Sequence, residues 1–416
     1  MVKKYVVAIV MLTSLFGYSQ ETFKAMFYNV LNFPLQEPVS RIQYLDVILN
    51  DYLPDVFMIC ELNNEDGADD ILRLMQDINP NYQRALFVEN TSDDTIGDQN
   101  DLQNMIFYDS SKFILESQAE VTTIYRDFNH YKLKLNTIDQ ASKPVYLDVF
   151  VTHLKSSSGT DNKNLRKQMV DAFVAYLSTM PNDSNVLLAG DLNLYTSSEP
   201  AFQELIDQTN NITLMDPANR IGSWSNNTSY LDVFTQSTRT TSALGGAGGG
   251  FDDRFDFIMT SENMATNPDI SFVSGTYQAY GNNNNSSCYN ENINSVNCSG
   301  PTFSQSIRDA LYYFSDHLPV TLTLETNETL SNKTLEPEYG ITIEGSNLIR
   351  DNITVKIHPQ LNITTLRIYN VLGQKMEEYK VVDRNFINLN VSYLSSGMYY
   401  IITDKNITEP LKFIKH

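Results

Sequence analysis

The chain has little cysteine and little positive charge for its length. Its 416 residues include three Cys, which are too few for a disulfide framework and exclude a small disulfide-stabilised scaffold. It has 29 Lys and Arg against 50 Asp and Glu, a formal net charge of -21, and no long basic run, which disfavours general electrostatic capture of nucleic acid. A hydrophobic content of 42% predicts a globular chain, and the length suggests two or three domains.

Long apolar runs are also scarce, and the one that stands out lies at the start. Lys3 and Lys4 precede the apolar run Tyr5–Phe16, and small residues follow it. This pattern predicts a signal peptide over residues 1–19, cleaved before Gln20. The run is shorter than the roughly 20 apolar residues that span a bilayer. We therefore expect export through the periplasm, a secreted or cell-surface location and no stable membrane insertion.

In an oxidising compartment the three cysteines are expected to differ. Cys288 and Cys298 enclose a polar, Asn-rich loop, and we expect them to form one disulfide. Cys60 ends the apolar run that starts at Val56, so we expect it to be a buried thiol.

From about residue 22 to 325, short apolar runs alternate with helical patterns. Apolar residues at helical spacing predict helices over 41–53, 68–78 and 164–177. Apolar runs predict strands over 26–31, 56–60, 105–108, 131–135, 145–152, 186–189, 255–259 and 320–324. Apolar strands between helices predict an α/β domain with sheet inside and helices outside.

The C-terminal part differs in composition and pattern. The acidic excess lies before residue 341, whereas residues 341–416 carry slightly more basic than acidic groups. Residues 326–340 have the composition of a linker, and the alternating runs after them predict a small all-β module. The predicted organisation is a signal peptide (1–19), an α/β domain (20–325), a linker (326–340) and a β module (341–416).

Polar residues that can carry chemistry cluster next to the predicted strands. Strand ends share one edge of a sheet, so their side chains can meet there. A single Asn or Asp after a strand is usually a turn residue, but eight such polar residues in one domain together favour a functional site. They are Asn29, Glu61, His153, Asp191 with Asn193, Asp256, and Asp316 with His317.

These residue types suit metal-assisted attack of water on a phosphorus ester. Carboxylate and amide oxygens are ligands for a hard cation such as Mg²⁺ or Mn²⁺. A His beside carboxylates suits proton transfer near neutral pH. The chain has no Gly-x-Ser-x-Gly motif, which disfavours a serine nucleophile.

The order of these motifs resembles the endonuclease/exonuclease/phosphatase superfamily. The motifs YNVLNF, CE, THL, GDLN, RFDF and SDH occur in the family order between about residues 22 and 325. The resemblance implies a four-layered α/β sandwich, with two central sheets flanked by helices and the site on one rim. The sequence departs from the family at Cys60, where most relatives have Gln before the metal-binding Glu.

The resemblance also implies a role for each residue. Glu61 and Asn29, with Asp316, would bind the Mg²⁺ or Mn²⁺ ion. A structural Ca²⁺ elsewhere is left open as an additional ion. His317 paired with Asp256 would transfer protons, and Asp191 would orient or activate water. Asn193 and His153 would hold the phosphate.

Two features near these motifs leave alternatives open. Arg126, in IYRDF, either lies near the substrate phosphate or forms a surface ion pair with Asp127 or Glu120. The run GGAGGG, residues 245–250, is not a Walker loop because no Gly-Lys-Ser/Thr follows. We interpret this run as a flexible loop that borders the site.

The C-terminal module resembles the type A sorting domain of the type IX secretion system. The matching positions are Tyr369, Asn370, Gly373, Leu394, Gly397, Tyr399 and Lys415. The usual Pro-Asn-Pro opening is missing, and Ser346, Asn347 and Leu348 stand in its place. The alternative is a generic β-sandwich binding module. The resemblance implies the type IX secretion machinery as a partner.

Together the patterns predict a secreted, metal-dependent phosphodiesterase, with an extracellular nuclease as the first choice and nucleic acid as its substrate. The alternatives are a lipid or small-molecule phosphoesterase of the same fold, which the single Trp, Trp224, disfavours, and a noncatalytic surface binding protein. We expect a monomer. The hypothesis requires Glu61, Asp191 and His317 to meet in space.

Overall fold

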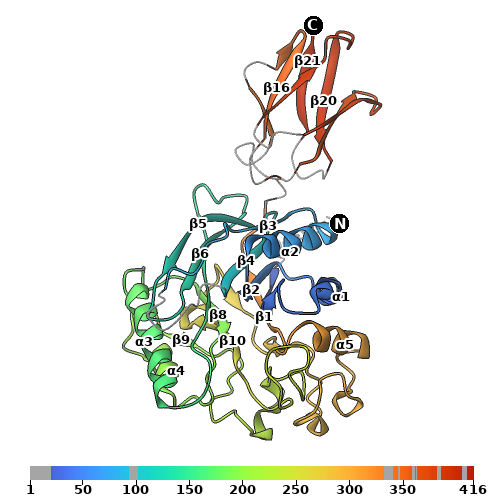
Figure 1. Ribbon diagram of the computed structural model, residues 1–416. Coiled ribbons are helices and arrows are strands. Elements are labelled where there is room, and N and C mark those ends of the chain that lie inside the picture. Colours follow the sequence, from blue (N-terminus) through green and yellow to red (C-terminus); the bar gives the residue numbers. More distant parts are fainter. Residues whose placement is uncertain are drawn as a thin grey trace, which may run out of the picture.

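The computed structural model describes residues 20–92, 102–331, 341–344, 347–357, 361, 363–381, 386–404 and 410–416. The predicted signal peptide, residues 1–19, lies outside these ranges, as does most of the predicted linker, 332–340. Figure 1 shows a larger α/β domain and a smaller all-β module. Within the described ranges, no helix combines the length and apolar character that crossing a membrane requires.

The larger domain contains two central sheets. The first has the strand order β11-β13-β1-β2-β4-β3, with β12 also paired to β13. The second has the order β5-β6-β7-β8-β10-β9. The strands of the first sheet are β1 (Glu21–Phe33), β2 (Val56–Leu62), β3 (Tyr82–Arg84), β4 (Gln103–Asp109), β11 (Ser271–Phe272), β12 (Gln278–Ala279) and β13 (Val320–Thr326). Those of the second are β5 (Phe113–Val121), β6 (Phe128–Leu135), β7 (Tyr146–His153), β8 (Val186–Asp191), β9 (Leu214–Met215) and β10 (Asp256–Ser261).

Helices cover the outer face of each sheet, so the domain has four layers. The helices are α1 (Ile42–Tyr52), α2 (Glu65–Ile78), α3 (Thr160–Leu177), α4 (Pro200–Leu205) and α5 (Gln305–Phe314). One buried cluster includes the inner faces of the two sheets and residues of α1, α2 and α5. A second buried cluster lies between the second sheet and the helices α3 and α4. The predicted four-layered α/β sandwich is confirmed. Short 3-10 helices are η1 (Val39–Arg41), η3 (Thr228–Val233), η4 (Glu262–Ala265), η5 (Ser286–Cys288) and η6 (Val296–Cys298).

Local sequence signals explain where the helices begin. Helix α2 starts before the predicted residue 68 because the Asn64 side chain accepts a hydrogen bond from the Gly67 N–H, which caps the helix. Helix α3 starts at Thr160, after Gly159, whose φ of 101° favours glycine. Helix α5 was not predicted, although its buried residues Ile307, Ala310, Leu311 and Phe314 have helical spacing.

The cysteines behave as predicted. Cys288 and Cys298 form a disulfide, and Cys60 is a buried free thiol in β2.

The C-terminal module contains two small sheets around its own core. Their orders are β14-β16-β19 and β15-β21-β20-β17-β18, and a separate buried cluster lies between them. The strands are β14 (Ile341–Ile343), β15 (Leu348–Ile349), β16 (Asn352–Ile357), β17 (Thr365–Asn370), β18 (Lys375–Lys380), β19 (Phe386–Asn390), β20 (Gly397–Thr403) and β21 (Leu411–Lys415). The domain boundaries at 325 and 340 stay predictions.

Strand direction explains why the polar motifs share one rim. In the first sheet β1 and β2 are parallel, and in the second sheet β7 and β8 are parallel. Within each pair the two C-terminal ends therefore lie at the same edge. Strand β10 is antiparallel to β8, and Asp256 at its start pairs with Asp191 at the end of β8. Strand β13 is antiparallel to β1, so the segment just before it reaches the same rim. The site therefore combines the ends of parallel strands with the beginnings of antiparallel ones.

Candidate active site

One hub, the carboxylate of Asp191, lies at the centre of the rim. Its Oδ2 accepts a hydrogen bond from Asn29 Nδ2 at 3.2 Å. The same oxygen lies 3.5 Å from His153 Nε2 and 3.7 Å from His317 Nε2. Its Oδ1 accepts the backbone N–H of Asn193 at 3.1 Å. Asp191 thus connects residues from both sheets.

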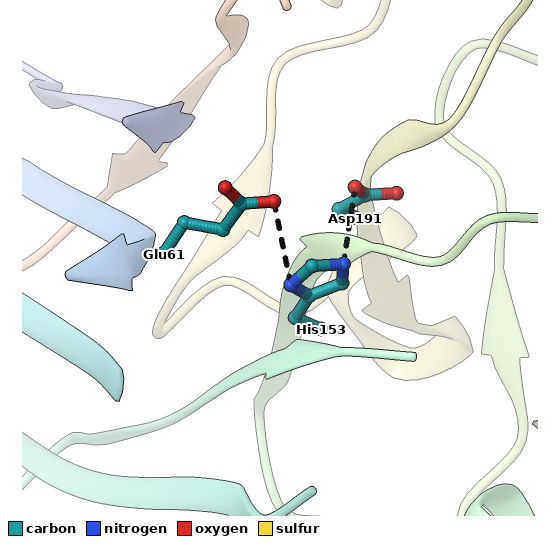
Figure 2. Close-up of side chains that lie close together, drawn as sticks. All are labelled: Glu61, His153 and Asp191. Carbon is teal, nitrogen blue, oxygen red and sulfur yellow. Dashed lines mark ion pairs between the residues drawn. The ribbon is translucent and has the colours of Figure 1, made fainter. Parts of the chain in front are cut away.

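A first group on this hub is formed by Glu61, His153 and Asp191. Figure 2 shows the His153 ring between the two carboxylates, with Nδ1 3.8 Å from Glu61 Oε1. Ligand atoms of the three residues lie within 4.8 Å of one another, which is close enough to share one cation. Among the described residues His153 Nδ1 has no hydrogen-bond partner, although it is buried. A buried polar atom without a partner fits a site that binds something further.

A β-bulge directs Glu61 into this group. The pairing register shifts between Ile59 and Leu62, and Glu61 has a left-handed φ of 61°. A bulge adds one residue to a strand and changes the direction of its side chain. Left-handed backbone is unfavourable for Glu, and such strain concentrates at functional sites.

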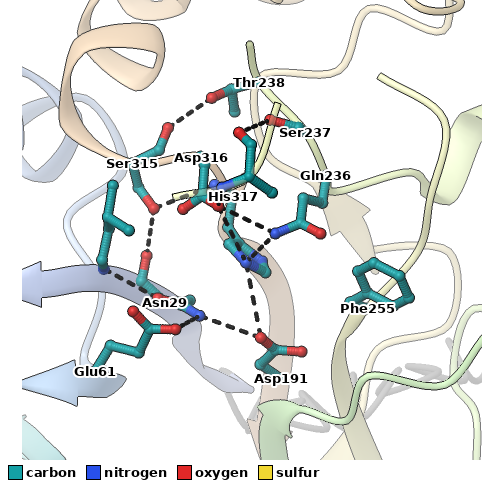
Figure 3. A network of polar contacts seen from close by, with 12 residues as sticks. Asn29, Glu61, Asp191, Gln236, Ser237, Thr238, Phe255, Ser315, Asp316 and His317 are labelled. Atoms are coloured by element: carbon teal, nitrogen blue, oxygen red, sulfur yellow. Dashed lines mark hydrogen bonds and ion pairs between the residues drawn. The ribbon is translucent and has the colours of Figure 1, made fainter. Parts of the chain in front are cut away.

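The second group is His317 with Asp256 and Asp191. Figure 3 shows His317 facing Asp191. His317 Nδ1 lies 2.7 Å from Asp256 Oδ2. The backbone holds the ring from behind, because Ser315 Oγ accepts the His317 N–H and donates to the Asn29 carbonyl at 2.7 Å. This His–Asp pair leaves Nε2 facing Asp191 and Gln236, an arrangement suited to proton transfer.

Asn29 joins the two groups, but through its nitrogen. Its Nδ2 donates to Glu61 Oε1 at 2.9 Å and to Asp191, while its Oδ1 accepts the Leu31 N–H at 3.0 Å. In this orientation it bridges two carboxylates. To act as the predicted cation ligand, the amide would have to turn over and lose the bond from Leu31.

Asp316 is held on one side only. Its Oδ2 accepts the Ala247 N–H at 2.6 Å and Gln236 Nε2 at 3.2 Å. Its Oδ1 is buried and has no partner among the described residues. This oxygen is therefore available to a cation.

Asn193, just after β8, and Arg126, just before β6, border His153 within the second sheet. Asn193 Nδ2 and Arg126 Nη1 both donate to the Leu154 carbonyl, each at 3.3 Å. Arg126 is only 5% exposed and lies over the Tyr125 ring, so it is a buried residue and not a surface one. A role for Arg126 near phosphate stays a prediction.

Burial and the crowded charges shift the ionisation of the site. Burial, with the carboxylates of Asp256 and Glu61, raises the pKa of Asp191 to about 8. Burial and Asp316 also raise the pKa of Glu61. Burial and Arg126 hold the pKa of His153 well below its usual value. Burial opposes the charge on His317, but Asp256, Asp316 and Asp191 together raise its pKa well above the usual value. Closely packed buried carboxylates with raised pKa values are typical of a functional site.

The donor set fits a hard divalent cation. It consists mainly of carboxylate oxygens, which suit Mg²⁺ or Mn²⁺, and it contains no thiolate. The His153 ring beside them, whose pKa is lowered, is neutral. The buried Oδ1 atoms of Asp256 and Asp316 have no partner among the described residues. The site thus holds more negative charge and more acceptors than the protein itself satisfies.

Sequence patterns missed Gln236, Ser315 and Thr235, which all lie in loops. Gln236 Nε2 lies 2.6 Å from His317 Nε2 and also contacts Asp316. Thr235 Oγ1 accepts the Asp256 N–H at 3.2 Å. Ser315 is the first residue of the SDH motif, so its place in the motif could have marked it as a site residue. Nothing in the sequence singles out Gln236 or Thr235.

Comparisons with known proteins give the following likenesses. No curated protein matches the chain. One similar solved structure is the human Nocturnin catalytic domain with bound sulfate, at 14% identity over 73% of this chain and 97% of that chain, with a TM-score of 0.45. Another is D. rerio TDP2 with single-strand DNA product, at 16% identity over 73% of this chain and 99% of that chain, with a TM-score of 0.46. A third is an endonuclease/exonuclease/phosphatase family protein from Bacteroides thetaiotaomicron, at 14% identity over 74% of this chain and 99% of that chain, with a TM-score of 0.44.

The C-terminal residues match a family model, and this match identifies the module. Residues 348–416 match the secretion system C-terminal sorting domain. The matched range includes strands β15 to β21, while β14 precedes it. The chain therefore carries a secretion-system C-terminal sorting domain, which indicates export by the type IX system to the cell surface or outside the cell.

Proposed function

We propose that this protein is an exported, divalent-cation-dependent phosphodiesterase that cleaves nucleic acid. One observation carries the proposal: Glu61, His153, Asp256 and His317 all gather around Asp191, with the ligand atoms of each group within 4.8 Å. Carboxylates beside an Asp-paired His are the parts that water attack on a phosphate ester requires.

In this proposal the carboxylates of Glu61 and Asp316 bind the cation. Asn29, Asp191 and His153 neighbour the cation site. A bound Mg²⁺ or Mn²⁺ would stabilise negative charge on the phosphate oxygens. Glu61 supports this role because the bulge in β2 directs it toward His153. Asp316 supports it through its unpartnered Oδ1.

The protein's own residues would handle water, protons and phosphate. Asp256 fixes the His317 ring, so Nε2 can exchange a proton with a group near Asp191. Asp191 would orient the attacking water. Neutral His153 and Asn193 would donate hydrogen bonds to the phosphate as its charge increases.

A local basic edge supports nucleic acid as the substrate despite the net charge of -21. Arg126 and Lys155 lie over the Tyr125 ring, next to His153. Phosphate contacts by such residues make affinity depend on salt. We expect cleavage of DNA or RNA to fall steeply with added salt, whereas salt-insensitive cleavage would argue against several phosphate contacts.

A membrane-lipid substrate is less well supported. Trp224, the one Trp of the chain, is fully buried between Phe202 and Phe257 and is not an exposed membrane anchor.

A substrate panel tests the proposal. The full chain is assayed with Mg²⁺, Mn²⁺ or chelator against plasmid DNA, RNA, sphingomyelin and a phosphomonoester. We expect cation-dependent cleavage of a nucleic acid, lost in the double variant Asp191→Ala with His317→Ala. Cleavage of sphingomyelin or the monoester alone would replace the nuclease proposal, and unchanged activity in the double variant would refute the site.

A further inference from the structure

The glycine run 245–250 contacts the site more closely than a bordering loop would. The Ala247 N–H donates to Asp316 Oδ2 at 2.6 Å. At Gly246 an added Cβ would lie 2.5 Å from Asp316 Cγ and 2.6 Å from Oδ2. Real Cβ contacts this short essentially do not occur, and Gly246 also has a left-handed φ of 68°. Only glycine lets the backbone lie directly against this carboxylate.

Buried side chains fix this segment from behind. Arg239 is fully buried and donates to three carbonyls, those of Tyr312 at 2.8 Å, Leu244 at 3.3 Å and Gly245 at 3.1 Å. Ser237 Oγ donates to the Ala247 carbonyl at 2.8 Å. The segment Leu244–Ala247, here called the glycine clamp, is thus tied to α5 and to the strand-like segment at Gln236.

Gln236 extends the contact from Asp316 to the catalytic His. Its Nε2 lies 3.2 Å from Asp316 Oδ2 and 2.6 Å from His317 Nε2. The Thr238 N–H donates to the Asp316 carbonyl at 3.0 Å. The carboxylate that the glycine clamp holds is therefore part of the same hydrogen-bonded unit as His317 (Figure 3).

We propose that the glycine clamp is a positioning element of the active site, with Gly246 as its key residue. It engages Oδ2 of Asp316, so that Oδ1 stays free for the cation, and it keeps Gln236 against His317. This inference rests on the proposed phosphodiesterase function. It replaces the sequence-based interpretation of a flexible border loop with a defined role.

Gly249 offers a matched control. Its φ of 117° also disfavours any side chain, but a Cβ there would meet nothing within 4 Å. Gly246→Ala and Gly249→Ala therefore both carry a backbone cost, which at φ 117° is no smaller than at φ 68°, and only Gly246→Ala adds a collision with Asp316. A loop that merely borders the site would tolerate both variants equally.

The experiment measures Mn²⁺ binding by calorimetry, kcat and KM on the nucleic acid cleaved by the wild type, and Tm without cation. We expect Gly246→Ala to lower kcat and Mn²⁺ affinity about 10–100-fold with a smaller change in KM, because displacement of a site group by about 1 Å costs that much. Gly249→Ala should stay within about twofold of the wild type in kcat and Mn²⁺ affinity. Equal losses in the two variants would overturn the inference.

A double-variant cycle shows whether Gly246 acts through Asp316. In Asp316→Ala the carboxylate is gone, so the methyl group of Gly246→Ala has room. We expect Gly246→Ala to add no further loss of activity or cation affinity in that background, and its Tm penalty to shrink. Full additivity would overturn the inference.

The cycle also separates this inference from the proposed function. A wild type without Mn²⁺ binding or cleavage would refute the proposed function. The Tm cycle on the cation-free proteins would still test the clamp contact, and a Tm penalty unchanged by Asp316→Ala would refute the clamp.

Discussion

Two buried His–Asp pairs in this domain look alike at first. His317 Nδ1 lies 2.7 Å from Asp256, and His130 Nε2 lies 2.8 Å from Asp148. All four side chains are buried. We call them the site pair and the helix pair, because His130 lies under α3.

The difference between the pairs lies in the second nitrogen of each ring. His130 Nδ1 contacts the hydroxyl of Tyr176 at 3.0 Å, and its ring stacks on Phe150 with centroids 4.3 Å apart. The second nitrogen of His317 instead lies near Gln236, Asp191 and Asp316. The helix pair is thus closed by aromatic groups, whereas the site pair opens onto carboxylates. A buried His–Asp pair alone is no sign of catalysis; the neighbours of the free nitrogen decide its role.

The largest expected effect separates the two pairs by activity. His317→Ala should lower kcat about 10²–10⁴-fold, the usual contribution of general acid–base catalysis. His130→Ala should leave kcat within about twofold, because the helix pair lies outside the rim. Steady-state kinetics on the cleaved substrate check both, and an equal loss in His130→Ala would break the comparison.

Cation binding should depend on the carboxylates near the site pair and not on exposed carboxylates elsewhere. Glu61→Gln removes a charged ligand atom beside His153 and should weaken Mn²⁺ binding at least about tenfold. Glu262→Gln, at an exposed 3-10 helix, is the matched control and should bind as the wild type does. Calorimetric titration gives both affinities; unchanged binding in Glu61→Gln would remove Glu61 from the site.

Folding stability should depend on the helix pair. His130→Ala leaves the Asp148 carboxylate buried without its partner and should reduce the free energy of unfolding by about 3 kcal/mol. Tyr176→Phe removes one hydrogen bond and should cost about 1 kcal/mol. Urea unfolding measures both values. A stability loss in His317→Ala larger than in His130→Ala would reverse the assigned roles.

The smallest expected effect concerns a buried arginine that ties two site strands together. Arg166 donates to the carbonyls of Lys155 and Ser157, which follow β7, and to Glu199, which follows β8. Arg166→Lys keeps the charge but loses the forked geometry, so we expect a several-fold loss in kcat/KM and about 1–2 kcal/mol of stability. The control Arg73→Lys, at an exposed ion pair with Asp70, should change neither quantity.

Much of the fold and most of the candidate site residues followed from sequence patterns. Apolar runs such as Val56–Cys60 and Val186–Ala189 predicted buried strands, and polar residues after them predicted the rim. Asp256 and His317 belong to the same rim for a reason that patterns could not supply: their strands run antiparallel to β8 and β1. Strand direction depends on pairing between residues far apart in the chain.

Other features depend on tertiary contacts in long loops. Gln236 lies in a stretch without regular periodicity, and only the fold brings it against His317. The glycine run was visible in the sequence, but its contact with Asp316 was not. The Asn29 amide turns its nitrogen toward the two carboxylates because its oxygen accepts the Leu31 N–H. No sequence motif indicates this orientation.

The central claim is that one divalent cation binds where these strand ends meet. Crystals of the full chain soaked in Mn²⁺, with data collected at the manganese absorption edge, test this directly. We expect an anomalous difference peak within coordination distance of Glu61 and at least one further rim carboxylate, and its loss in Glu61→Gln. An ordered rim with no peak in the wild type, or a peak that survives in Glu61→Gln, would contradict the account.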